Sequence, residues 1–396
     1  MKEDALQNRI ILLLGLAGFM VVADNWVVSP ILPAIMADLH SDLPKAGLLI
    51  TAYMIPFGIC QILFGPLADR YGKKEVITLA MIMFSLATGL CAAGRNLASL
   101  SLFRAVTGVF AASVIPVSFA LIADIFPLQQ RQKAIGTFLG IAFLGQGMSM
   151  IIGGTIAHLS NWQGVFVAYA LLSLIPTALL IRYYRQLPST KNRGGNILTP
   201  YVDLLTNPES MYTYGIIMLE GLFIIGSFSY GGAYLAAVHE FNALSIGLVM
   251  TGFGAMSVIG GRISGKLVRR FGARKVVVLG LALTAAADLL IWLMGNQILI
   301  FSLAIALMGF GFIIAHSTLV TRASEFAKKA TGTAMSLVAF SFMGCGGIGT
   351  ALGGMIIRSH GLPVLYLCYG LALSATVLVT TVILGKYPCN SAGAAS

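Results

Sequence analysis

The chain has few charged residues for its length: Asp, Glu, Lys and Arg make up only 10% of its 396 residues. A soluble domain carries about 25% charged residues, so this composition excludes a soluble globular protein. The chain also lacks the Gly-x-x-x-x-Gly-Lys-Ser/Thr motif, which excludes an ATP-binding loop of that type. Its five cysteines have neither metal-site nor disulfide spacing, and we expect no metal, no cofactor and no enzyme activity.

Long apolar runs dominate what is present, and 58% of all residues are hydrophobic. Runs of about 20 residues are too long and too continuously apolar for barrel strands, so they predict membrane-spanning helices. The sequence therefore predicts an all-α membrane protein with twelve spans. We expect them at about residues 9–35, 45–67, 75–95, 98–125, 133–158, 163–184, 212–237, 243–264, 276–295, 297–320, 331–356 and 362–385.

The formal net charge of +11 could indicate an acidic partner such as nucleic acid. Most of the 25 Lys and Arg residues, however, fall at the chain ends or in the segments after the even-numbered spans. Cytoplasmic segments of membrane proteins are rich in these residues. The distribution therefore predicts both termini in the cytoplasm, the lipid bilayer as a partner, and no nucleic acid.

Two stretches 200 residues apart are nearly alike: residues 65–74 read GPLADRYGKK, and residues 265–275 read GKLVRRFGARK. The pair Gly153-Gly154 recurs as Gly353-Gly354 at the same offset. Such an internal repeat indicates two homologous, pseudo-symmetric halves of six helices each. We expect an N-terminal bundle in residues 1–184, a cytoplasmic linker in 185–211 and a C-terminal bundle in 212–396.

The loop at residues 65–74 resembles the G-x-L-a-D-r-x-G-r-k loop of the major facilitator superfamily. Residues 102–108, LFRAVTG, resemble the R-x-x-x-G motif of its proton-coupled branches, and residues 24–33, DNWVVSPILP, the first-helix motif of drug–proton antiporters. The antiporter motif of span five keeps its final Gly153-Gly154 but has Ser149-Met150 where Gly-Pro is usual. This resemblance covers essentially the whole chain. It implies a twelve-helix fold in which helices one, four, seven and ten line a central cavity.

Charged residues inside spans are costly and mark functional sites by default. Asp24 and Arg104 lie at similar depths, so we expect an ion pair in the outer part of the implied cavity. A carboxylate there would exchange protons as substrate binding or closure changes its surroundings, although a purely structural pair is the alternative. Glu220 is a second candidate for a proton or a cationic substrate, the alternative being a group that reaches water. Asp288, in a peripheral helix, is expected to be a polar contact between helices or to reach outward.

The cavity helices also carry aromatic and small polar side chains, which suit an amphipathic organic solute rather than a strongly ionic one. Each of them could instead be a packing residue, and the histidine among them could relay protons. The candidates are Asn25, Trp26, Tyr53, Ser113, Tyr230, Tyr234 and His316.

The loop after span two predicts a cytoplasmic latch that closes when the cavity faces outward. Its glycines allow turning and close approach, and its Asp can face the N-terminus of helix eleven. Arginines of this loop and of the loop after span four can bridge to the Asp that ends span four. The second half has Arg269 in place of the loop Asp, so it cannot form the same latch. The expected members are Gly65, Asp69, Arg70, Gly72, Lys73, Asp124 and Arg131.

These patterns predict a proton-coupled secondary transporter in the bacterial inner membrane, exporting amphipathic organic compounds or drugs by alternating access. Two alternatives remain open: a dedicated exporter of one metabolite, such as a metallophore or lipid-like solute, and a proton-coupled uptake symporter. A receptor without transport activity is disfavoured, because the loops are short and no signalling domain is attached. We expect a small-molecule substrate and protons as ligands, and a monomer.

Overall fold

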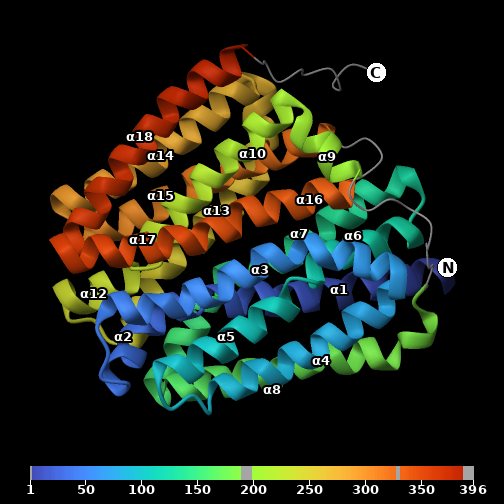
Figure 1. Ribbon diagram of the computed structural model, residues 1–396, viewed down its shortest axis with the longest axis horizontal. Coiled ribbons are helices and arrows are strands. Elements are labelled where there is room, and N and C mark those ends of the chain that lie inside the picture. The colour runs from blue at the N-terminus through green and yellow to red at the C-terminus, as the bar shows by residue number, and fades with distance from the viewer. Residues whose placement is uncertain (1, 189–198, 327–330, 387–396) are drawn as a thin grey trace.

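The computed structural model describes residues 2–188, 199–326 and 331–386. Within these ranges twelve helical segments are long and apolar enough to cross a membrane, which confirms the predicted number of spans. The helices form two groups in Figure 1, with the N-terminal half below and the C-terminal half above, so the chain has the expected all-α fold in two six-helix halves.

The first half contains six spans, of which the first and fourth are each divided into two helices. Its helices are α1 (Lys2–Trp26), α2 (Val28–Asp38), α3 (Leu43–Tyr71), α4 (Lys73–Cys91), α5 (Leu97–Ala111), α6 (Val114–Ile125), α7 (Leu128–Leu159) and α8 (Trp162–Arg182). Two short elements follow it outside the spans: η1 (Tyr184–Gln186) and α9 (Thr199–Thr206).

The second half also contains six spans, of which the seventh and eleventh are interrupted by π-helical turns, η2 and η3. Its helices are α10 (Pro208–Glu220), η2 (Gly221–Ile225), α11 (Gly226–Phe228), α12 (Gly231–His239), α13 (Ala243–Phe271), α14 (Ala273–Met294), α15 (Ile298–Glu325), α16 (Thr331–Ala339), η3 (Phe340–Gly344), α17 (Cys345–His360) and α18 (Leu362–Lys386).

Prolines explain the breaks in the first and fourth spans, which the sequence interpretation treated as continuous. Proline has no N–H to bond the carbonyl four residues earlier, and its ring crowds that carbonyl. Pro30 therefore breaks the helix at Trp26, where α1 ends, and Pro116 breaks it at Ala112, just after α5. The candidate residues around Asp24 consequently sit beside a bend rather than in a straight helix.

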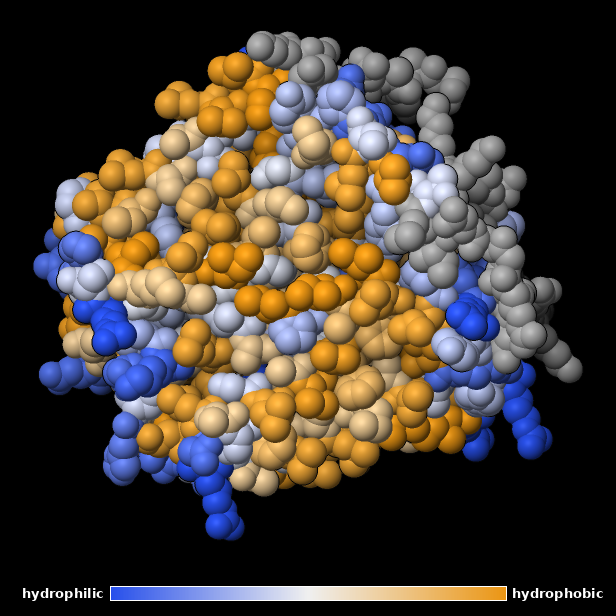
Figure 2. All heavy atoms as spheres, in the orientation of Figure 1, coloured by the Kyte–Doolittle hydropathy of each residue, from blue (hydrophilic) through white to orange (hydrophobic). Residues whose placement is uncertain are grey.

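A broad apolar surface covers the face of the molecule shown in Figure 2, with polar residues gathered towards its two ends. Leu86, Leu171 and Leu378 of the membrane-spanning helices are each more than half exposed, as expected for side chains that face lipid. We call the end where α1 begins and α18 finishes the terminal side, and the end where α2 and α12 finish the distal side. An even number of spans brings the start of α1 and the end of α18 to the same side, as Figure 1 shows.

Candidate functional site

Asp24 and Arg104 form a buried ion pair between α1 and α5. Arg104 Nη1 donates to Asp24 Oδ2 at 2.7 Å, and Nη2 reaches the backbone oxygen of Asp24 at 3.4 Å. The side chains are 0% and 1% exposed, so neither charge has water to replace its partner. Asp24 Oδ1 and Arg104 Nε have no hydrogen-bond partner among the described residues, which leaves one carboxylate oxygen available for a proton.

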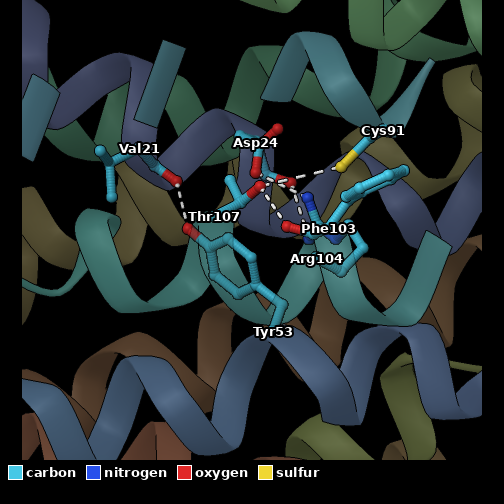
Figure 3. A network of polar contacts seen from close by, with 7 residues as sticks. All are labelled: Val21, Asp24, Tyr53, Cys91, Phe103, Arg104 and Thr107. Atoms are coloured by element: carbon cyan, nitrogen blue, oxygen red, sulfur yellow. Dashed lines mark hydrogen bonds and ion pairs between the residues drawn. The ribbon is translucent and has the colours of Figure 1, made fainter. Parts of the chain in front are cut away.

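The surroundings of this pair come from the first half (Figure 3). The Arg104 guanidinium lies 4.2 Å from the ring centre of Tyr53 and 5.8 Å from that of Phe166. Tyr53 donates from its hydroxyl to Val21 O at 3.4 Å, and Cys91 Sγ lies 3.7 Å from Thr107 Oγ1. The expectation that this pair lies in a cavity between the halves is therefore corrected. Tyr53, expected to line the cavity, instead packs under Arg104 inside the first bundle.

A second buried pair joins Glu220, at the end of α10, to His316 on α15. His316 Nδ1 lies 2.8 Å from Glu220 Oε2, and the carboxylate is fully buried. The imidazole packs against Phe312 and Phe342, with ring centres 5.1 Å and 4.4 Å away. Sequence reasoning singled out both residues but did not pair them. Glu220 lies in helix seven and His316 in helix ten, and both helices line the central cavity of the fold that the family resemblance implies. This shared position could have predicted the pair.

The remaining cavity candidates divide between the interface and the helix interiors. Trp26 crosses the interface, with its ring 5.2 Å from Phe228 and 5.5 Å from Phe253, and Asn25 Nδ2 points at Met343 Sδ 3.8 Å away.

The other three candidates hydrogen-bond or stack within their own half. Tyr230 donates to Thr350 O at 2.8 Å and also packs against Gly47 of α3 across the interface, and Tyr234 stacks on Phe301. Ser113 donates to Phe110 O at the break between α5 and α6.

The two halves contact each other closely towards the distal side. Ser29 Oγ shares its proton between the carbonyl oxygens of Phe228 and Ser229, at 3.2 Å and 3.0 Å, and Thr51 donates to Gly347 O at 2.9 Å. Glycines let the backbones meet: a Cβ at Gly247 would lie 3.2 Å from Gly154 Cα. We call these contacts the distal seal, formed by Ser29, Thr51 and Gly154 with Phe228, Ser229, Gly247 and Gly347.

Sequence reasoning missed the role of Ser29, although Ser229 stands at the same offset of 200 residues as the loop repeat. Near the middle of the interface, a Cβ at Gly58 would lie 2.7 Å from the backbone nitrogen of Gly344. Gly58 therefore marks a second close approach, between α3 and η3. Both contacts depend on the relative position of the halves, which no local pattern specifies.

The loop after span two forms an ionic cluster on the terminal side, in which Lys73 rather than Arg70 contacts Asp124. Lys73 Nζ bonds Asp124 Oδ2 at 2.6 Å and lies 3.4 Å from Ala120 O. Asp69 is exposed and interacts electrostatically with both residues. Arg70, expected to bridge to Asp124, instead lies over the ring of Tyr71 at 5.8 Å. One contact with Asp124 thus comes from the start of α4, because α4 packs against α6.

The other members of the expected latch have distinct positions. Gly72 has φ of 110°, which favours glycine, so it makes the turn between α3 and α4. A Cβ at Gly65 would meet nothing within 4 Å, so no close approach is made there. The Arg131 side chain, and residues 327–330 before helix eleven, lie outside the described part of the structure.

The linker segment α9 contacts the first half on the terminal side, where the Tyr201 hydroxyl donates to Ile62 O at 3.1 Å. Burial raises the pKa of this phenol, so Tyr201 acts as a neutral donor. The contact ties the connection between the halves to α3.

Asp288 is the remaining charged residue expected inside a span. Its side chain on α14 is fully buried, so the expectation that it could reach outward to water is wrong. It faces the interior of the second half, near Ser227 and Tyr366.

Comparison with known proteins agrees with this architecture. The model of the Major Facilitator Superfamily matches residues 14–238 and 216–395. The chain is 27% identical over 359 residues to the uncharacterized MFS-type transporter YceJ of Bacillus subtilis (strain 168), covering 89% of this chain and 90% of that protein. It is 27% identical over 379 residues to the quinolone resistance protein NorA of Staphylococcus aureus (strain COL), covering 94% and 96%.

A solved structure shows the same fold. A POT family transporter in complex with 5-aminolevulinic acid aligns with a TM-score of 0.80 at 12% identity, covering 96% of each chain. The family match spans most of the chain, and the structure has the twelve membrane-spanning helices that the sequence predicted. The chain therefore belongs to the Major Facilitator Superfamily and is a multi-pass membrane transporter of small molecules rather than an enzyme.

Proposed function

We propose that this transporter is a proton-coupled exporter of amphipathic organic compounds that works by alternating access. The observation that carries the proposal is the presence of two fully buried carboxylates, each bonded to one basic partner in its own half: Asp24 with Arg104, and Glu220 with His316. Buried charged pairs are rarely more stable than apolar contacts, so a function explains them better than stability does.

In the Asp24 pair, Arg104 and a proton compete for the same carboxylate. While Asp24 is ionised, the bond to Arg104 at 2.7 Å holds α1 to α5 beside the bend at Trp26. Protonation removes the negative charge and weakens this bond, which frees the bend to change its angle. A proton taken up at Oδ1 therefore favours a different packing of the first half.

In the Glu220 pair, the carboxylate is bonded to an imidazole rather than to a guanidinium. Protonation of Glu220 Oε1, which has no partner among the described residues, removes the negative charge that faces His316 and loosens the contact between α10 and α15. Phe312 and Phe342 stack on the imidazole and keep water from its faces. Since η2 begins directly after Glu220, this loosening reaches the segment of span seven that continues to the distal seal.

The direction of opening follows from which side is closed. The distal seal joins the halves through hydrogen bonds and glycine contacts, which supports a state whose substrate site opens to the terminal side. The distribution of Lys and Arg supports a cytoplasmic terminal side. We further propose a bacterial inner-membrane location, a monomer, and halves at 1–184 and 212–396 joined by the linker 185–211.

The interface supports an amphipathic substrate. Trp26, Phe228, Phe253 and Phe312 present aromatic surface, with Phe253 stacked on Phe312 at 5.6 Å, while Asn25 keeps a carbonyl oxygen without a partner. Aromatic walls with a few polar groups bind varied organic solutes. The name of one relative, a quinolone resistance protein, supports a drug-like substrate.

The test is transport in proteoliposomes with an imposed pH gradient, using a panel of cationic dyes and a panel of metabolites. We expect gradient-driven dye movement opposite to the proton flow, lost in Asp24→Asn and in Glu220→Gln. Asp42→Asn is the matched control, because Asp42 is an exposed carboxylate outside the spans. Movement in the same direction as the protons would indicate an uptake symporter. Coupled transport that survives both substitutions would contradict the assignment of the proton sites.

A further inference from the structure

Asp288 is a buried carboxyl group that neither pair uses. Its side chain is 0% exposed on α14, and within the described residues neither oxygen forms a hydrogen bond of regular geometry, although the Ser227 side chain lies close to it. Among the described residues no Lys, Arg or His side chain contacts it, so it differs from Asp24 and Glu220, which each have a basic partner. An ionised carboxylate without a charged partner is costly in such a place.

The neighbours of Asp288 can bond a carboxyl group but cannot neutralise a charge. Ser227 of α11 lies beside it, and the phenols of Tyr366 and Tyr369 on α18 interact with it electrostatically. The Tyr366 hydroxyl is itself buried without a partner. Residues 298–315 of α15 and 243–261 of α13, the parts of those helices at this depth, contain no titratable side chain.

This carboxyl group lies directly behind the distal seal. Ser227 immediately precedes Phe228 and Ser229, whose carbonyl oxygens accept the proton of Ser29 from the other half. The span breaks there, between α11 and α12, and Gly232 packs against the backbone oxygen of Ser29. Tyr369, next to Asp288, fills the space beside Gly226 and donates to Gly349 O at 2.5 Å. Parting of the halves must therefore move the segment that covers Asp288.

We propose that Asp288 is a proton-binding site of the distal seal, occupied while the seal is closed and emptied when it opens. On opening, water reaches the carboxyl group, the O–H bond of Asp288 breaks and the proton leaves to that water. The carboxylate that remains accepts hydrogen bonds from the hydroxyls of Ser227 and Tyr366. Release of this proton favours the open seal, and its rebinding favours closure. The inference rests on the alternating access proposed above, and it adds a proton site in helix nine, outside the two charged pairs.

The experiment measures the distance across the seal as a function of pH. Spin labels are attached at Ala37→Cys and Ala237→Cys, two exposed alanines at the distal ends of α2 and α12, with the five native cysteines replaced by serine. Distances are recorded by double electron–electron resonance in lipid nanodiscs between pH 5 and pH 9. We expect a longer-distance population that grows as the pH rises. Each proton released on opening changes the open-to-closed ratio by up to about tenfold per pH unit.

In Asp288→Asn, which imitates the protonated group, we expect this slope to fall by up to one proton and the short distance to persist at high pH. Thr380→Val is the matched control, because Thr380 on α18 is also fully buried with an unpartnered oxygen, and it should behave as the parent. Tyr366→Phe keeps Asp288 but removes a donor to its ionised form. We expect it to shift the transition to higher pH, and it serves as a second test if Asp288→Asn folds poorly.

An unchanged slope in Asp288→Asn, or an unchanged transition in Tyr366→Phe, would overturn the inference while leaving alternating access intact. A distance that changes with substrate but does not depend on pH, in the parent or in any variant, would also overturn the inference and leave alternating access intact. A distance that responds to neither pH nor substrate would overturn alternating access itself, and the inference with it.

Discussion

The Asp24–Arg104 pair gives a quantitative prediction about the first half. Two unit charges 2.7 Å apart attract by about 6 kcal/mol at an effective dielectric constant of about 20. Desolvation offsets much of this attraction, so the pair adds little net stability as a whole. Removal of one partner is different, because the other charge remains buried without compensation. We therefore expect Asp24→Asn to lower the free energy of unfolding by about 3–5 kcal/mol.

The magnitude can be checked by a double-mutant cycle in detergent. Asp24→Asn and Arg104→Gln are expected to be destabilised singly, each with an apparent Tm lower by roughly 6 °C or more for a unit the size of one half. The double variant leaves no unpaired charge, so we expect a coupling energy of at least about 2 kcal/mol. Asp42→Asn, at an exposed pair with Lys45, should show no measurable change. Additive losses in the double variant would refute the reasoning, since the two charges would then not depend on each other.

Four further predictions concern the second pair, the distal seal, the middle of the interface and the terminal side. Glu220→Gln and His316→Gln should each abolish pH-driven dye transport in proteoliposomes while dye binding persists, because each removes one member of the bonded pair on which proton exchange is proposed to act; retained coupling in both would contradict this. Ser29→Ala removes the donor to the carbonyls of Phe228 and Ser229, at a cost of about 1 kcal/mol to the closed seal. The population with an open distal side, measured by spin-label distances, should therefore rise about fivefold. An unchanged population would show that other contacts hold the seal. Gly58→Ala should shift the same distances towards opening, because its Cβ would meet Gly344. The control Gly136→Ala, whose Cβ would meet no described atom within 4 Å, should leave the distances unchanged. Equal effects of the two substitutions would refute the steric argument. Lys73→Met should increase cysteine accessibility from the terminal side by removing the bond to Asp124, and unchanged accessibility would separate this bond from gating.

Much of the fold was predictable because it depends on local sequence. The bilayer requires each long apolar run to be a helix, so the runs alone predict twelve spans. The repeat at an offset of 200 residues predicts two halves, and it also relates Ser29 to Ser229 across the seal. The bends at Trp26 and Ala112 could also have been predicted, from Pro30 and Pro116, although the spans were first treated as continuous.

The arrangement of the site was less predictable, because side-chain pairing depends on the rotation and packing of helices. The depth of Asp24 and Arg104 indicated that they could meet, but not that they meet inside the first bundle with Tyr53 beneath them. Asp124 is bonded by Lys73 rather than by Arg70, because the start of α4 faces α6 and Arg70 points to Tyr71. Arg70 lies at the end of α3 and Lys73 at the start of α4, so their side chains point to different neighbours. The composition of the loop does not specify these directions.

The sequence by itself determined which groups could carry charge into the membrane: Asp24, Arg104, Glu220 and Asp288 stand out in any apolar run because their burial is costly. Only the tertiary structure decided what each of them does there. It supplied Asp24 and Glu220 with basic partners 80 and 96 residues away and, within the part of the chain that the structure describes, left Asp288 with none. The physical reason is that desolvation follows from a residue's own position in a span, whereas its compensation comes from whichever distant helix packs against it.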